Sequence, residues 1–141
     1  ILSSSTFHWL RDLPLLLHRL HRQMTPEATL CFSLYSMNNL REVREITGIG
    51  LDYFSMHQLQ DLVRQEFHLL ACEEELITLN FQDPSTLVQH LRDTGVNALQ
   101  TGPWSKGRLR EFLDQYGLRF RNSSGGVSLT YHPVYCLARR E

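Results

Sequence analysis

The chain has 141 residues, of which 42% are hydrophobic and 21% are charged, and its formal net charge is -1 at pH 7. This length and composition suit one globular domain with a buried core, and the small net charge argues against a nucleic-acid-binding protein. No apolar run approaches the roughly 20 residues of a membrane span, so we do not expect a membrane protein.

The chain opens with Ile1-Leu2 followed by three serines, a pattern typical of the end of a buried strand that runs into a loop. We therefore expect more sequence upstream and interpret the chain as the carboxyl-terminal part of a larger α/β protein. Leucines at helical spacing then predict one amphipathic helix over 7–23, bent near Pro14. A continuous apolar run over 28–35 predicts a buried strand.

Two short helices are expected next. Asn39 with Glu42 three residues later is typical of a capping box, and this helix should stop at Gly48. Ser55 with Gln58 repeats the pattern before a helix over about 56–66. A strand follows over 69–81, and its alternation of apolar residues changes near Glu75, which indicates a twist, a bulge or an exposed sheet edge.

The last third of the chain predicts two helices and a strand. One helix begins at Asp83-Pro84 and ends at Gly95, and the second begins at Ser105 and ends at Gly117. The residues 100–103 between them should form a loop.

The final strand over 127–139 has β-branched and aromatic residues on both faces, which is typical of a central strand. Pro133 cannot donate a ladder hydrogen bond, so we expect a bulge there and the best pairing over 134–138. Strands that alternate with helices predict an open α/β sheet with crossover connections.

Ligands of open α/β sheets bind beyond the carboxyl ends of the strands. Candidate pocket-lining or cofactor-binding residues therefore follow the first strand end: Ser3, Ser4, Phe7, His8 and Trp9. These residues could instead form an ordinary helix cap with two core aromatics. Tyr131 and His132 could likewise face a site or simply pack in the final strand.

The three cysteines, Cys31, Cys72 and Cys136, lack zinc-binding or redox-motif spacing and are interpreted as structural thiols of a protein in a reducing compartment. His18 and His21 form the one close histidine pair, which is weak support for a metal site, so we expect none. The residues also supply no pair of groups arranged for acid-base catalysis.

Six segments, in collinear order over nearly the whole chain, carry a further signal: residues 4–9, 30–33, 39–42, 92–98, 129–132 and 138–140. Together they resemble one family, the malonyl-acyl-carrier-protein O-methyltransferases of biotin synthesis. His8 departs from the family, which commonly has Gln before the tryptophan.

The resemblance implies a class I S-adenosylmethionine-dependent methyltransferase fold in which the last of seven strands is antiparallel and inserted beside its neighbours. Mapped onto this chain, Ile1-Leu2 ends the fourth strand, and the fifth, sixth and seventh strands are 28–35, 69–81 and 127–139. The first three strands, the glycine-rich loop and the acidic ribose-binding residue are absent, so we expect the cofactor site to be incomplete and this chain alone to be inactive.

The resemblance also divides the domain. Residues 1–83 and 122–141 would supply the sheet and its flanking helices, and residues 84–121 would form a helical lid insertion over the active site. The lid region is basic, with five basic and two acidic residues from Lys106 to Arg121. Its residues Lys106, Arg108 and Arg110 either dock an acidic carrier protein or form an ordinary solvated helix face.

A malonyl carboxylate needs no general base, because it is already ionised near neutral pH, but it does need a cationic or hydrogen-bonding clamp. Candidates for this clamp are Arg41, Arg44, Tyr131 and His132. Two alternatives stay open: a methyltransferase with a different small-molecule acceptor, and a non-catalytic module that self-associates through an exposed sheet edge. The expected location is the cytoplasm.

Overall fold

The computed structural model of the chain describes residues 1–95 and 104–141. The predicted loop over 100–103 and the end of the 92–98 motif lie outside these residues. The described elements are, in chain order, β1 (Leu2–Ser3), the 3-10 helix η1 (Phe7–Trp9), α1 (Leu13–Gln23), β2 (Thr29–Tyr35), α2 (Arg41–Thr47), α3 (Met56–Arg64), β3 (His68–Glu74), β4 (Ile77–Phe81), α4 (Pro84–Asp93), α5 (Lys106–Arg119), β5 (Val127–Tyr131) and β6 (Pro133–Arg139).

These elements form two compact units. The first consists of residues 1–39, 51–76 and 132–141, and the second consists of residues 40–50 and 77–131. Each unit has its own hydrophobic core.

The first unit contains a four-stranded sheet in the order β1-β2-β6-β3. β1 runs parallel to β2, whereas β6 lies antiparallel between β2 and β3. The late strand β6 therefore separates two earlier strands that run in the same direction. This arrangement confirms the predicted sheet with its inserted antiparallel last strand.

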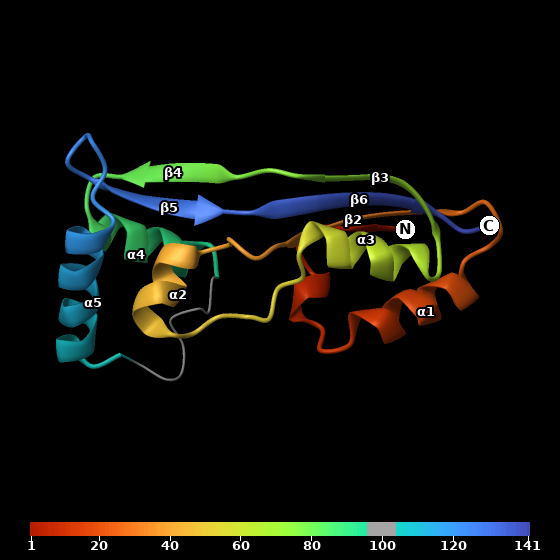
Figure 1. Ribbon diagram of the computed structural model, residues 1–141. Helices are drawn as coiled ribbons and strands as arrows, with labels where there is room; N and C mark the ends of the chain where they lie inside the picture. The colour runs from red at the N-terminus through yellow and green to blue at the C-terminus, as the bar shows by residue number, and fades with distance from the viewer. Residues whose placement is uncertain (96–103) are drawn as a thin grey trace. The chain divides into compact units, whose positions relative to one another are not determined.

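Helices α1 and α3 cover one face of this sheet (Figure 1). Alternate residues of β2, namely Leu30, Phe32 and Leu34, point into the core from that face. Leu17 of α1 and Leu59 of α3 meet them there, and neither side chain retains any exposed surface. The opposite face of the sheet is only partly buried.

The first predicted helix, over 7–23, is two separate pieces in the structure. η1 ends at Trp9, and α1 begins only at Leu13, where the Asp12 carboxylate accepts a hydrogen bond from the Leu15 amide at 2.9 Å. Pro14 occupies the first turn of α1, where a missing amide hydrogen costs no helical hydrogen bond. Pro14 thus helps to start the helix and does not bend it.

The second unit is built on the antiparallel pair β4-β5, with Ile77 opposite Tyr131 and Phe81 opposite Val127. Helices α2, α4 and α5 contribute Val43, Leu87 and Tyr116 to its core. The expected start of α4 is confirmed, since the Asp83 carboxylate accepts from the Thr86 amide at 2.8 Å.

The predicted capping box at Asn39 and Glu42 is wrong, whereas the one at Ser55 and Gln58 is present. The residue before α2 is Leu40, which adopts a left-handed conformation with φ of 51° and makes no side-chain cap. The side chains of Asn39 and Glu42 instead form hydrogen bonds with residues that are distant in the sequence, as described below.

Three further boundaries differ from the prediction. α5 continues through Gly117 to Arg119, because a glycine inside a helix weakens it without ending it. The two long strands are interrupted, one after Glu74 and the other at His132. No bulge lies at Pro133, whose carbonyl accepts from the Glu75 amide at 3.0 Å, and the register shift falls between Leu69 and Ala71.

Candidate functional site

In the first unit, the carboxyl ends of the parallel strands β1 and β2 lie at the same edge of the sheet. The loop after β1 is tied to β2, because the Ser5 amide donates to both the carbonyl and the Oγ of Ser33, each at 3.1 Å. Ser3 is half-buried and Ser4 is exposed. The loop therefore presents serine hydroxyls where the sequence places the candidate pocket.

Aromatic rings also lie at this edge of the sheet. The His8 ring lies 5.2 Å from the Trp9 ring and 5.1 Å from the ring of Tyr35, the last residue of β2. Burial lowers the pKa of His8 below its ordinary value, so the neutral imidazole is favoured. Its Nδ1 atom is buried and has no hydrogen-bond partner among the described residues. His8 is therefore a half-buried polar group at the predicted edge, able to meet a ligand.

Trp9 and Phe7 occupy different surroundings. Trp9 is 53% exposed, whereas Phe7 is 8% exposed and its ring packs 5.1 Å from Phe32 in the core. Trp9, His8 and the serines thus lie at the sheet edge, whereas Phe7 packs in the core of the first unit.

His132 organises the loop that follows β2. Its Nδ1 accepts from the Asn38 amide at 3.1 Å, so the ring proton resides on Nε2, which donates to the Glu74 carboxylate at 3.0 Å. The backbone of His132 donates to the Asn39 side chain at 3.2 Å and accepts from the Ser36 amide at 2.8 Å. Both ring nitrogens are thus occupied within the protein, and His132 holds the residues that precede α2.

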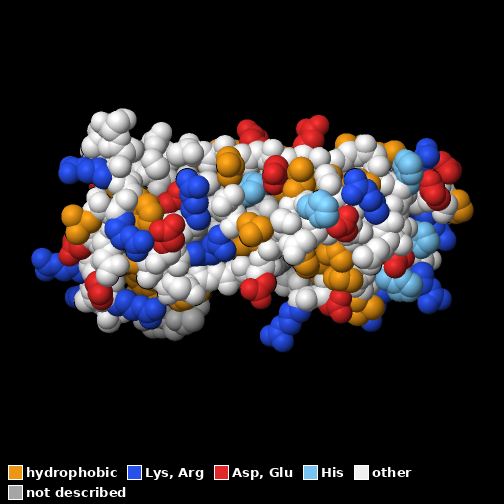
Figure 2. Space-filling model, in the orientation of Figure 1, with side chains coloured by type: hydrophobic (Ala, Val, Ile, Leu, Met, Phe, Trp, Pro, Cys, Tyr) orange, Lys and Arg blue, Asp and Glu red, His pale blue; other side chains and the backbone are white. Residues whose placement is uncertain are grey.

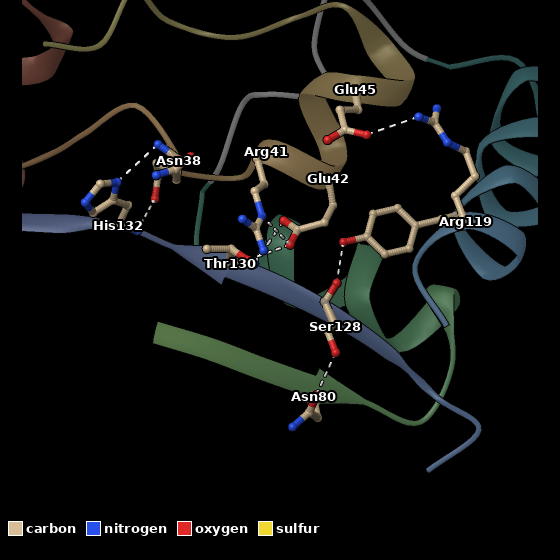
Figure 3. A network of polar contacts seen from close by, with 11 residues as sticks. Asn38, Arg41, Glu42, Glu45, Asn80, Arg119, Ser128, Thr130 and His132 are labelled. Carbon is tan, nitrogen blue, oxygen red and sulfur yellow. Dashed lines mark hydrogen bonds and ion pairs between the residues drawn. The ribbon is translucent and has the colours of Figure 1, made fainter. Parts of the chain in front are cut away.

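In the second unit, Arg41 lies at the start of α2 beside the buried carboxylate of Glu42 (Figure 3). Arg41 Nε donates to Glu42 Oε1 at 3.3 Å, and the Arg41 side chain remains 52% exposed. Glu42 also accepts from the amide and the hydroxyl of Thr130, at 3.0 and 2.5 Å. The arrangement fixes the base of Arg41 while leaving half of its side chain in contact with solvent.

Arg44 and Tyr131 lie elsewhere in the second unit. The aliphatic part of Arg44 packs against Gly50, where an added Cβ would come within 2.3 Å of Arg44 Cδ. The Tyr131 hydroxyl lies 3.0 Å from His90 Nε2 on α4, and the two rings meet edge to face. Within this unit, Arg41 is thus joined to β5 through Glu42, whereas Tyr131 is joined to α4.

The basic residues of α5 occupy two flanks of the helix. Lys106 and Arg110 are four residues apart, which separates them by only about 40° around the helix axis. Arg108 falls on the other flank with Arg119, and the Arg108 guanidinium lies 5.4 Å from the centre of the Trp104 ring. Arg119 forms an ion pair with Glu45 at 3.1 Å. Figure 2 shows Lys and Arg side chains over this region with acidic side chains among them.

Sequence reasoning missed several residues that shape these surroundings, above all Tyr35, Asn38, Glu42 and Glu74. Tyr35 carried a usable signal, because it ends a predicted strand at the edge where the sequence places the candidate pocket. The others act through contacts between residues more than 50 positions apart, which no local pattern encodes.

The described residues contain no group of three or more His, Cys, Asp or Glu side chains arranged to hold a metal ion. No helix among them is long and apolar enough to cross a membrane. An open pocket of about 520 Å³ in the first unit is lined by residues of the α1 and α3 ends and of the start of β3, including Arg64 and His68. Because β3 runs parallel to β2, the start of β3 lies at the end of the sheet opposite to the end that carries His8. The pocket is therefore at the opposite end of the sheet from His8.

The predicted resemblance is confirmed by curated proteins. The chain is 39% identical over 140 residues to a malonyl-[acyl-carrier protein] O-methyltransferase of Chlorobium luteolum, a match that covers 99% of this chain and 53% of that protein. It is 36% identical to the enzyme of that name from Acinetobacter baylyi, again over 99% of this chain, and 56% of the relative. The chain thus spans about half the length of the curated relatives it matches. No protein-family model matches it.

Solved structures support the fold. The solved structure of protein BH2331 from Bacillus halodurans superposes with a TM-score of 0.64 at 12% identity, and the match covers 99% of this chain and 68% of that protein. The YcgJ protein of Bacillus subtilis gives a TM-score of 0.55 at 13% identity over all of this chain and 63% of its own. The predicted α/β methyltransferase fold is therefore confirmed.

Proposed function

We propose that this chain is the acceptor-side part of an S-adenosylmethionine-dependent methyltransferase that methylates the free carboxylate of a malonyl thioester on an acyl carrier protein. The observation that carries the proposal is the similarity over 99% of the chain to relatives named for this activity. The residues of the relatives beyond this match would supply the rest of the catalytic domain. The chain would act in the cytoplasm, in biotin synthesis.

The residues at the candidate site suit such a reaction because it needs little chemistry from the protein. The malonate carboxylate is ionised near neutral pH and is itself the nucleophile. When bound, S-adenosylmethionine would supply an electrophilic methyl group that the carboxylate oxygen could accept directly. No proton has to move, so the protein must align the two groups and exclude water.

The edge formed by β1 and β2 would form one side of the cofactor site. Ligands of this fold bind beyond the carboxyl ends of parallel strands, and that edge carries Ser4, His8, Trp9 and Tyr35. The Nδ1 of His8, which is buried and has no partner in the part of the chain that the structure describes, is a polar atom that a bound ligand can satisfy. The cofactor would supply the electrophilic methyl group, and these residues would hold and shield it.

Arg41 is our proposed clamp for the malonyl carboxylate. Its guanidinium carries the fork of donors that matches two carboxylate oxygens, and its side chain is half-exposed. His132 is better suited to a positioning role, because its ring nitrogens already serve Asn38 and Glu74. Arg44 and Tyr131 remain secondary candidates for the clamp.

The acidic carrier protein would dock on α5. The five basic and two acidic residues from Lys106 to Arg121 give this segment an excess of positive charge. Such complementarity accelerates encounter more than it strengthens the final complex. Residues 84–121 would then form the lid over the thioester.

The test is a methyl-transfer assay on the protein that contains this chain, with labelled S-adenosylmethionine and a malonyl-carrier thioester. The expected product is a methyl ester on the free carboxylate. In the same assay, Arg41→Ala should raise KM for the thioester about 10- to 100-fold, because a charge-assisted contact is worth about 1.5–3 kcal/mol, and should leave KM for S-adenosylmethionine unchanged.

Three controls sharpen this assay. Arg41→Lys keeps the charge but loses the fork and should restore only part of the affinity. Arg22→Ala removes an exposed arginine of α1, in the other unit, and should have no effect. Equal methylation of thioester acceptors that lack a free carboxylate would contradict the proposed substrate, and a failure to bind S-adenosylmethionine would contradict the proposed enzyme class.

A further inference from the structure

Cys72 of β3 and Cys136 of β6 face each other across two antiparallel strands. Their sulfur atoms are 2.7 Å apart, although the residues are 64 positions apart in the sequence. The sequence offered no sign of this contact, because neither cysteine belongs to a recognisable spacing motif.

The strand register gives the pair a geometry that accepts a covalent bond. The Glu75 amide donates to the Pro133 carbonyl, so that pair is hydrogen-bonded. Hydrogen-bonded and non-hydrogen-bonded pairs alternate along an antiparallel ladder, which makes Cys72 and Cys136, three pairs further on, a non-hydrogen-bonded pair. Such pairs have Cα atoms about 4.5 Å apart, which is within the range that disulfides span.

The two thiols are not equivalent. Cys136 is 2% exposed, whereas Cys72 is only partly buried. The hydrogen bond from Cys136 lowers the pKa of Cys72, and Arg64 adds to this effect against the opposing effects of burial and Glu74. The same contact, together with burial, raises the pKa of Cys136. Cys72 is therefore the accessible nucleophile, and Cys136 is the second thiol behind it.

Cys31 provides an internal comparison. Phe32 is the β2 residue that pairs with Cys136, so its neighbour Cys31 points to the opposite face of the sheet. Cys31 cannot reach the other two thiols without a change of strand register.

We propose that Cys72 and Cys136 form a reversible redox dithiol, a modification site for small disulfide oxidants. The Cys72 thiolate attacks one sulfur of the oxidant, forming a mixed disulfide and releasing one thiolate. Cys136 then loses its proton and attacks Cys72, which releases the second thiolate and leaves a disulfide between the strands. The protein loses two electrons and two protons in total, and the small disulfide becomes two thiols. A reducing thiol reverses the reaction.

The experiment uses the folded chain and glutathione disulfide as the probe, with methyl transfer left out. After native exposure, quenching by alkylation and digestion, mass spectrometry should find one intramolecular link between the peptides of Cys72 and Cys136. The thermal midpoint should rise by about 5–10 °C in the oxidised form and fall again with dithiothreitol, because the link closes a long loop.

Variants separate the roles of the thiols. In Cys136→Ser the reaction should stop at a stable glutathione adduct on Cys72, and in Cys72→Ser the thiol of Cys136 should stay unmodified. The matched control Cys31→Ser should form the link as the unaltered chain does. A link that involves Cys31, a link between two chains, or complete alkylation of Cys72 and Cys136 after oxidation would overturn the proposal. Mapping the unaltered chain decides the question even where a variant does not fold.

Discussion

Glu42 is a charged side chain with 6% of its surface exposed, and its carboxylate joins α2 to β5 within the second unit (Figure 3). Three donors satisfy it: the amide and the hydroxyl of Thr130, and Nε of Arg41. A buried carboxylate is tolerated only when such donors compensate for its lost hydration. Glu42 therefore links the proposed clamp residue Arg41 to the strand that precedes His132.

Replacing Glu42 should destabilise the second unit. We expect Glu42→Ala to lower the free energy of unfolding by about 2–4 kcal/mol, because the Thr130 amide and hydroxyl would remain buried without an acceptor. Urea denaturation followed by circular dichroism measures this loss. Glu45→Ala is the matched control on the same helix, since its ion pair with Arg119 is exposed and should contribute about 0–1 kcal/mol. Equal losses for the two variants would contradict this account of Glu42.

His8 should make stability depend on pH. Burial lowers its pKa in the folded chain, so the unfolded chain binds the proton more readily. Stability should therefore fall as the pH drops below about 6.5, the ordinary pKa of histidine, and His8 should have no such effect at higher pH.

The measurement is the free energy of unfolding across this pH range in the unaltered chain and in His8→Gln. The substitution should flatten the loss of stability at acid pH, because glutamine cannot take up the proton. His57→Gln removes a histidine whose side chain is 82% exposed and serves as the control. An unchanged pH profile in His8→Gln would show that His8 does not titrate as its burial demands.

The candidate residues show what local sequence can and cannot predict about a site. His8 and Trp9 follow the end of β1, a position that can be located from a strand end in the sequence, whereas their contact with a ligand stays a prediction. The roles of Asn39 and Glu42 were predicted wrongly as a helix cap. Their spacing satisfies the capping pattern, but both side chains bond to distant partners. Asn39 accepts from the His132 amide, and Glu42 accepts from the Thr130 amide.

Among the elements, α5 is the one whose surface carries the proposed partner specificity. Its inward face supplies Phe112 and Tyr116 to the second core, and its two flanks carry the basic residues. Burial raises the pKa of the Tyr116 hydroxyl, which donates to the Ser128 carbonyl at 2.8 Å and anchors the helix to β5. A well-anchored helix can present charges to a partner in a fixed orientation.

Charge reversal on each flank of α5 should show which one meets the carrier protein. We expect Lys106→Glu with Arg110→Glu to reduce the association rate about tenfold or more at low salt, because opposite charges steer encounter. Surface plasmon resonance against an acyl carrier protein measures this rate.

Arg108→Glu tests the opposite flank of α5 in the same way. The control is Arg19→Glu with Arg22→Glu, which reverses two charges on α1 of the other unit. An association rate that is insensitive to salt and to all of these variants would rule out α5 as an electrostatic docking surface.

At the scale of the whole chain, the order of helices and strands was predictable because apolar periodicity and caps are local signals. Ser55 with Gln58 and Asp83 with Thr86 fix two helix starts that the sequence shows directly. The division into two units was not predictable, since it depends on where paired strands are interrupted. Neither Glu75 nor His132 is a strand breaker by residue type, so no local signal in the sequence marks the two interruptions.

The position of β6 has a consequence for the order of folding. β2 and β3 do not pair with each other, and both pair with β6. Thr29 of β2 therefore pairs with Arg139, which lies 110 residues later in the chain. Bringing such distant residues together has a high entropic cost before any ladder hydrogen bond is gained, which slows folding. During synthesis, β2 and β3 would emerge with these edges unpaired. The three consecutive acidic residues Glu73 to Glu75 would then help to keep nascent chains from pairing with one another.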